Sequence, residues 1–172
     1  MKITAQEEYG LRCLLQLARA HGSQSLTIPE IAAAEGLSVP YVAKLLSVLR
    51  QAGLIESTRG RAGGYHLTRS PAEVHLGSVL LVLGEPLFED GIYCAKHAGP
   101  ETDGACVHHD ACGLRALWQT LDQWMRHALD QITLAELMQS EGQIAELLRA
   151  RLKTTGVEPL VPLVTLQPLS RE

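Results

Sequence analysis

Hydrophobic residues recur at helical spacing in the first part of the chain. Tyr9, Cys13 and Leu17 lie four positions apart, so residues 4–21 are predicted to form an amphipathic helix. Cys13 on its apolar side is interpreted as a small buried hydrophobic residue. The sequence Thr-Ile-Pro-Glu at 27–30 has the pattern of a capping box and predicts the start of a second helix.

A tight turn and a third helix follow. Gly36 is free to take a positive φ, and Ser38 is predicted to cap a helix over residues 39–52. The inward stripe of this helix is Val42, Leu45, Leu46 and Leu49. Its outward side carries Pro40, Tyr41, Ala43, Lys44 and Ser47. Two short helices joined by a glycine turn are the helix-turn-helix pattern.

A short β-hairpin is predicted directly after the third helix. Residues 54–58 and 65–68 read as strands, and the tip between them contains Arg59, Arg61 and three glycines. Arginine side chains on such a tip suit insertion into a narrow minor groove of DNA. The combination predicts a winged helix that binds double-stranded DNA. A helical hairpin and a β-hairpin with no DNA role is the alternative, because helix-turn-helix geometry alone is common.

The distribution of charge favours the DNA interpretation. The whole chain has a net charge of −4. Residues 38–70, however, hold five basic residues against Glu56 alone, which gives a local balance of +4. Binding to nucleic acid depends on such local charge more than on the total.

The second half of the chain carries a long apolar stripe. Residues 76–83 are nearly all apolar and predict a short core helix. Beyond residue 113 the apolar positions recur at steps of three or one, which predicts a long helix. These positions are Leu114, Leu117, Trp118, Leu121, Trp124, Met125, Ala128, Leu129 and Ile132. Self-association into a homodimer is the expected way to bury this stripe, although packing on the winged domain can hold at the same time.

The chain is predicted to be mostly α with a small β-hairpin wing: a winged helix-turn-helix domain plus a long dimerisation helix. Four segments are expected. They are the winged DNA-binding domain (1–72), a connecting helix and cysteine-rich loop (73–113), the dimerisation helix and C-terminal helices (114–153), and a Pro-rich tail (154–172) that is extended, docked or disordered. No apolar run approaches the roughly 18–20 residues of a membrane span. Residues 1–20 also lack the pattern of a signal peptide, so a cytoplasmic location is expected.

The stretch from Cys94 through Cys106 to Cys112 carries the candidate chemistry. Eleven and then five residues separate these cysteines, and no hydrophobic period runs through the segment. Clustered thiols in a reducing compartment favour a metal or an iron–sulfur cluster over disulfides. On chemistry alone, zinc held by the cysteines and by one of His97, His108 or His109 is nearly as plausible. An acidic surface loop with incidental cysteines is the third possibility, whereas a Cys–His enzyme is not favoured because no oxyanion element can be identified.

The chain resembles the Rrf2 family of iron–sulfur winged-helix transcription regulators, of the kind typified by IscR and NsrR. The segments that carry the resemblance are MKIT…EYGLRCLLQLA, IAAAEGLSVPYVAKLLSVLRQAGLI, STRGRAGGYHL, the three-cysteine loop and ITLAEL. The resemblance implies a homodimer with an iron–sulfur cluster close to the first helix of the other subunit. It implies Cys94, Cys106 and Cys112 as ligands, with Glu8 from the other subunit preferred as the fourth and His108 or His109 as the alternatives. A [2Fe-2S] cluster is favoured and [4Fe-4S] is the alternative.

The same resemblance implies DNA contacts by Ser38, Tyr41 and Lys44 on the recognition helix and by Arg59 on the wing. Four features depart from the family's pattern. Eleven residues follow the first cysteine, where about five are usual. Arg115 stands where the IscR branch has a histidine, and Pro40 and Ala43 replace a serine-like and an acidic residue.

Three functions follow from these observations. The first is a dimeric, non-enzymatic regulator whose cluster senses redox state, nitric oxide or iron–sulfur status and alters DNA affinity. The second keeps DNA binding but makes the site a zinc or thiol switch. The third is an iron–sulfur carrier without DNA binding, against which the basic wing argues.

Overall fold

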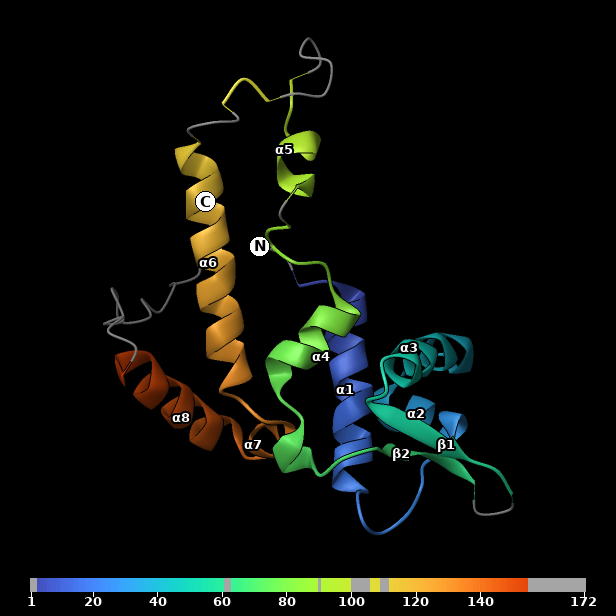
Figure 1. Cartoon of the computed structure of the whole chain (residues 1–172). Helices are drawn as coiled ribbons and strands as arrows, with labels where there is room; N and C mark the ends of the chain where they lie inside the picture. The colour runs from blue at the N-terminus through green and yellow to red at the C-terminus, as the bar shows by residue number, and fades with distance from the viewer. Residues whose placement is uncertain (1–2, 61–62, 90, 100–105, 109–111, 155–172) are drawn as a thin grey trace, which may run out of the picture. The chain divides into compact units, whose positions relative to one another are not determined.

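The computed structural model describes residues 3–60, 63–89, 91–99, 106–108 and 112–154. As predicted, the fold is mostly helical with a small two-stranded antiparallel sheet (Figure 1). The elements in chain order are α1 (Ala5–Arg19), α2 (Ile28–Glu35), α3 (Val39–Gln51), β1 (Ile55–Thr58), β2 (Gly64–Leu67), the 3-10 helix η1 (Pro71–Glu73), α4 (Leu76–Leu83), α5 (Ile92–Lys96), α6 (Gly113–Asp130), α7 (Leu134–Leu137) and α8 (Glu141–Thr154). The chain forms two units, Met1–Met138 and Gln139–Glu172. The predicted Pro-rich tail lies almost wholly outside the described residues.

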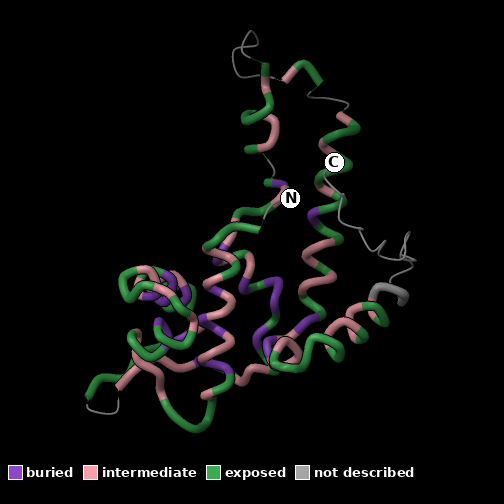
Figure 2. Tube along the Cα trace, turned by 180° about the vertical axis from the view of Figure 1, so that it is seen from behind, coloured by how far each residue is buried: buried purple, intermediate pink, exposed green. Residues whose placement is uncertain are grey.

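The core of the first unit lies where α1, α2 and α3 face one another (Figure 2). The side chains predicted to point inward on α3 are all fully buried, and so is Cys13 on α1. Helix α1 stands between α3 and α4 (Figure 1). Gly10 on α1 lets Leu83 of α4 approach closely, because a Cβ at Gly10 would overlap the Leu83 side chain. The first helix therefore connects the helix-turn-helix to the second half of the unit.

The predicted helix starts are confirmed, with one difference at α3. Thr27 and Glu30 make both hydrogen bonds of the capping box at α2. Ser38 occupies the N-cap position of α3 but makes no side-chain capping bond. The reason is local: Pro40 has no backbone N–H to donate, and the N–H of Tyr41 donates to the Ser38 carbonyl instead. The Ser38 hydroxyl is thus not committed to the helix start.

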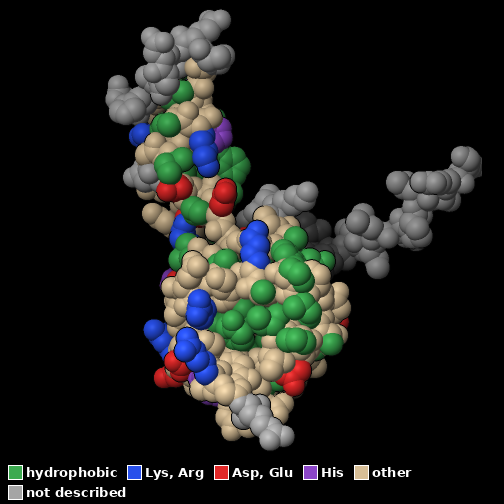
Figure 3. Space-filling view, turned by 90° about the vertical axis from the view of Figure 1, so that its right-hand side faces the viewer, with side chains coloured by type: hydrophobic (Ala, Val, Ile, Leu, Met, Phe, Trp, Pro, Cys, Tyr) green, Lys and Arg blue, Asp and Glu red, His purple; other side chains and the backbone are tan. Residues whose placement is uncertain are grey.

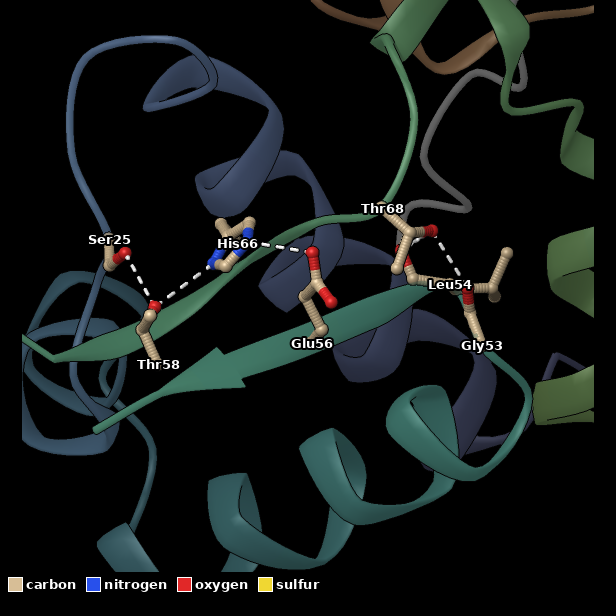
Figure 4. Close-up of polar contacts among 7 residues, drawn as sticks. All are labelled: Ser25, Gly53, Leu54, Glu56, Thr58, His66 and Thr68. Carbon is tan, nitrogen blue, oxygen red and sulfur yellow. Dashed lines mark hydrogen bonds and ion pairs between the residues drawn. The ribbon is translucent and has the colours of Figure 1, made fainter.

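The wing is a hairpin that is anchored at its base. Strands β1 and β2 pair in antiparallel register, with Glu56 opposite His66. The hydroxyl of Thr68 donates to the carbonyls of Gly53 and Leu54 at 2.7 and 3.1 Å, which closes the base of the hairpin (Figure 4). Leu26, just before α2, exchanges two backbone hydrogen bonds with Tyr65 on β2. The wing therefore has a fixed base from which its tip projects.

A buried carboxylate ties α6 to the segment after α4. Asp122 is 6% exposed and accepts hydrogen bonds from the backbone N–H groups of Leu87 and Phe88 and from Arg126. Two short elements, η1 and α5, were not predicted, because three and five residues are too few to show a helical period. Within the part of the chain that the structure describes, no single helix has the length and apolarity to cross a membrane. Helices α2 and α3 reach the length and apolar composition of a membrane span only when they are counted together, and a bend of 112° separates them.

Candidate nucleic-acid interface and cysteine loop

The start of α3 presents most of the predicted DNA-contacting residues to solvent. Ser38, Pro40 and Lys44 are exposed. Tyr41 is half-buried instead, because its ring packs edge-on against Tyr9 of α1, with centroids 6.0 Å apart. The prediction that the Tyr41 side chain points outward is therefore only partly correct. Sequence spacing within α3 gives no signal of a contact with a residue 32 positions earlier.

Arg59 lies exposed at the tip of the wing. It precedes Gly60, whose φ of +113° is a conformation that favours glycine. A Cβ at Gly63 would lie only 2.4 Å from the carbonyl oxygen of Thr58, so this turn also requires glycine. The second predicted wing arginine, Arg61, lies outside the described residues. The glycines thus serve the geometry of a tip that carries a cation.

Polar contacts connect the wing to the loop before α2. His66 Nε2 lies 3.0 Å from a Glu56 carboxylate oxygen, and His66 Nδ1 lies 3.4 Å from the Thr58 hydroxyl (Figure 4). The Thr58 hydroxyl is in turn 3.5 Å from that of Ser25. These contacts link both strands to residue 25 and limit how freely the wing moves.

The face that carries α2, α3 and the wing combines apolar and basic side chains. Figure 3 shows hydrophobic side chains gathered at its centre and Lys and Arg side chains beside them. Val39 is 47% exposed, and the cations Lys44, Arg50 and Arg59 are all exposed. This arrangement provides positive charge for a phosphate backbone and a less polar surface between the charges.

A charged contact joins α1 to the end of α2. Arg12 Nε donates to a Glu35 carboxylate oxygen at 2.6 Å, and its guanidinium also donates to the Glu35 carbonyl at 3.1 Å. Gln16 donates to the other carboxylate oxygen. The hydrogen bond to Glu35 raises the already high pKa of Arg12. The Arg12 guanidinium also lies over the Tyr9 ring, 5.4 Å from its centroid.

The sequence analysis did not predict this contact, and the residue of opposite charge nearest to Arg12 on the same helix is Glu8. Glu8 contributes only a weaker electrostatic interaction with Arg12. Glu35 lies in another helix, 23 positions away, so the spacing within α1 carried no signal of it. Glu8 itself is exposed near the start of α1 and remains accessible.

The cysteine loop brings two of its three cysteines to one arginine. Cys94 lies on α5, and Cys112 is the N-cap of α6. The backbone N–H of Arg115 donates to the Cys112 sulfur at 3.4 Å, and its guanidinium donates to the Cys94 sulfur at 3.9 Å. Cys106 is half-buried, and none of the cysteines forms a disulfide. The role of Arg115 as a donor was not predicted.

The donor set suits an iron–sulfur cluster, because free cysteine sulfurs are the ligands that such clusters take and Arg115 donates hydrogen bonds to two of them. Among the described residues no three His, Cys, Asp or Glu side chains are grouped tightly enough to hold a metal ion. His109 and residues 100–105 lie outside that set, as would any ligand from a second subunit. His97 instead bonds locally, since its Nδ1 lies 2.8 Å from the Tyr93 carbonyl oxygen, to which it can only donate, and His108 is exposed.

Helix α6 leaves much of its apolar stripe uncovered within the described chain. Its exposed large hydrophobic residues are Leu114, Leu117, Trp118, Leu121 and Trp124, with exposed fractions from 37% to 62%. Nearby, α1, α4 and α6 line a groove of about 820 Å³ whose walls include Leu11, Leu80 and Met125. An exposed apolar stripe of this length indicates an interaction surface.

The sequence of the chain matches a family model and several known proteins. Residues 3–140 match the Rrf2 family model, described as an iron-dependent transcriptional regulator. The HTH-type transcriptional regulator NsrR of Geobacillus kaustophilus is 36% identical over 152 residues, covering 88% of this chain and 99% of that protein.

Two solved structures share the fold at 30% identity. IscR of T. potens superposes with a TM-score of 0.62, covering 80% of this chain and 86% of that one. CymR of B. subtilis, titled as the global cysteine regulator, gives a TM-score of 0.61 and covers 80% and 96%.

Proposed function

Because the chain belongs to the Rrf2 family of transcriptional regulators, we propose that it is a cytoplasmic homodimer whose DNA binding is controlled by an iron–sulfur cluster. DNA binding and transcription regulation follow from the family, and the relatives are named as regulators rather than enzymes. The proposal concerns the cluster, the dimer and the residues that serve each. The observation that carries it is the shared hydrogen bonding of Arg115 to Cys94 and Cys112 at the start of α6.

Cys94, Cys106 and Cys112 would hold the cluster, with Glu8 of the partner subunit as the fourth ligand. We favour [2Fe-2S] over [4Fe-4S]. When bound, the group supplies a centre that reacts with oxidants and nitric oxide. Arg115 donates hydrogen bonds to two of the thiolate sulfurs, and the N-terminus of α6 favours their negative charge.

Helix α1 is the proposed route from the cysteine loop to the DNA. Glu8 and Arg12 lie one turn apart on this helix, and Arg12 holds Glu35 at the end of α2. Tyr9, between them, packs against Tyr41 on the recognition helix. A displacement of α1 would therefore move the start of α3. Regulation requires that the loop with the cluster and the loop without it favour different positions of α3. The two forms of the protein then differ in DNA affinity.

The DNA contacts proposed are Ser38, Pro40, Tyr41 and Lys44 from α3, with Arg59 and Arg61 from the wing. The exposed stripe of α6 would form the dimer interface, which places two recognition helices on two half-sites. Dimerisation also accounts for the proposed position of Glu8 near the loop of the other subunit.

The decisive experiment is anaerobic purification followed by an absorption spectrum, iron and sulfide analysis, and DNA titration with and without the cluster. We expect a coloured protein whose DNA affinity changes when the cluster is lost. A colourless protein with stoichiometric zinc would exclude the cluster. Equal DNA affinity in all states would exclude the sensing mechanism while leaving DNA binding intact.

Glu8→Ala tests the fourth ligand in the same preparation. We expect an altered absorption spectrum and faster cluster loss, with Glu8→Asp restoring part of the wild-type behaviour. Glu85→Ala, which removes another exposed carboxylate, is the matched control and should leave the spectrum unchanged. An unchanged spectrum in Glu8→Ala would remove Glu8 as a ligand.

A thiol switch is the second candidate function. The observation that favours it is that Cys94, Cys106 and Cys112 are free and partly accessible in one loop. Under this alternative the metal-free protein would bind DNA, and mild oxidation would change that affinity through a disulfide that mass spectrometry detects.

A further inference from the structure

The first turn of the recognition helix presents an unusually apolar surface. Val39 is 47% exposed, Pro40 is exposed and Ala43 is half-buried. With about 100° between successive residues, these three side chains fall on one side of α3, within roughly a quarter of its circumference. Lys44 lies at the edge of this stripe and is exposed.

Polar groups border this stripe but do not interrupt it. Ser38 precedes it with a hydroxyl that makes no capping bond. Ser47, one turn further on, is already paired with Gln51 at 3.4 Å. The exposed cations Lys44, Arg50 and Arg59 lie around the same face, which favours DNA over a protein as the partner.

The chemistry of the major groove limits what such a surface can recognise. When the first turn of a recognition helix meets the base edges, its side chains face hydrogen-bond donors, acceptors and the thymine methyl. Val39, Pro40 and Ala43 have no polar side-chain group, and Pro40 also lacks a backbone N–H. Packing them on unpaired polar base atoms would be unfavourable, whereas the C5-methyl of thymine is an apolar contact.

We propose that Val39, Pro40 and Ala43 select thymines in each operator half-site through their C5-methyl groups. The inference rests on the DNA binding of the proposed function and adds the chemical basis of operator choice. It does not depend on the cluster, because it concerns residues of the reading surface alone.

Deoxyuridine provides a direct test, since it removes the thymine methyl and keeps every hydrogen-bonding group. The full-length protein would first select its preferred duplexes from a random pool. Each thymine of the selected site would then be replaced singly by deoxyuridine, and binding measured at fixed salt. We expect at least two thymines in each half-site at which affinity falls by about fourfold, the effect of one methyl group removed from an apolar contact.

Variants assign the effect to this surface. Val39→Ala should weaken binding to the thymine duplex and remove the deoxyuridine effect at one position. Gln139→Ala, at an exposed position outside the winged helix, is the control and should keep the full effect. Thermal melts of both variants establish that the fold is retained, and Ala43→Ser, which adds one hydroxyl, provides a second variant if Val39→Ala melts early.

The outcomes separate this inference from the proposed function. Changes below twofold at every thymine, in a protein that still selects a defined site, would overturn methyl recognition and leave the regulator intact. A deoxyuridine effect that Val39→Ala and Ala43→Ser both leave unchanged would assign it to other residues. If no duplex is selected above random DNA, site-specific regulation fails, and this inference fails with it. A loss of cluster sensing alone would leave the thymine effect unchanged.

Discussion

Cys13 and the three loop cysteines lie in opposite environments. Cys13 is fully buried on α1, and burial raises the pKa of its thiol to about 11. The loop cysteines are partly accessible. Because the thiolate is the reactive form, the Cys13 thiol should not react at neutral pH in the folded protein.

Thiol labelling of the metal-free protein at pH 7.5 tests this difference. We expect the loop cysteines to be modified rapidly and Cys13 only after unfolding in denaturant. Cys13→Ala should therefore leave the native labelling count unchanged and lower the denatured count by one. Rapid native labelling of Cys13, identified by peptide mass spectrometry, would contradict its burial. The sign of the shift also predicts that stability falls as pH rises from about 9 toward 11, since the unfolded thiol ionises first.

Arg115 offers a second prediction at the scale of one residue. Its hydrogen bonds to Cys94 and Cys112 should stabilise the more negative, reduced state of a bound cluster. Arg115→Ala is thus expected to lower the midpoint reduction potential, measured by anaerobic spectroelectrochemistry. Arg19→Ala removes an exposed arginine at the end of α1 and serves as the control. A potential shared by wild type and Arg115→Ala would mean that the guanidinium does not interact with the cluster.

Between α1 and the helix-turn-helix, stability depends on a half-buried ion pair. Glu35 has a side chain only 8% exposed, so removing Arg12 leaves a carboxylate with Gln16 as its remaining side-chain donor. Arg12→Ala should therefore lower the urea concentration at the midpoint of unfolding. Glu35→Gln should lower it less, because its amide oxygen still accepts a hydrogen bond while no charge is left buried.

The same pair should affect regulation if α1 carries the signal. In Arg12→Ala the ratio of DNA affinities with and without the cluster should move toward one, while the cluster spectrum is retained. A normal ratio in a measurably destabilised variant would show that Arg12 supports the fold without transmitting the state of the loop.

At the level of elements, local signals in the sequence were sufficient for most helices and strands. The capping box at Thr27, the apolar spacing in α1 and α3, and the glycine-rich tip all specify structure through near neighbours. Tertiary contacts were not accessible in this way. The pairing of Arg12 with Glu35, the contact of Tyr9 with Tyr41 and the bonds from Arg115 to sulfur depend on how separate elements pack.

In the candidate site too, local patterns predicted some features, whereas features that depend on packing were not predicted. The sequence identified exposed residues on α3 and the wing, because helix periodicity and turn chemistry determine which side chains point outward. It did not predict that Pro40 would leave the Ser38 hydroxyl uncommitted, although the missing N–H of proline was a usable signal. The arrangement of the cysteines depends on a segment without hydrophobic periodicity and, in the proposed dimer, on a second subunit, neither of which local patterns specify.

For the whole molecule, the exposed stripe of α6 is the proposed dimer interface. Leu117, Leu121 and Trp124 lie at helical spacing and are 38–48% exposed. If this stripe is the dimer interface, a charge at Trp124 must be buried without a partner, which is strongly unfavourable. Trp124→Glu is therefore expected to be monomeric by analytical ultracentrifugation at concentrations where the wild type is dimeric.

Gln123→Glu introduces the same charge at the adjacent exposed position of α6 and should remain dimeric. Because two linked half-site contacts reinforce each other, the monomer should bind a two-half-site operator roughly 100-fold more weakly, while binding to a single half-site changes little. Helical content by circular dichroism must match the wild type for this comparison to hold. A dimeric Trp124→Glu protein with unchanged operator affinity would place the interface elsewhere, and with it the position from which a partner's Glu8 could reach the cysteine loop.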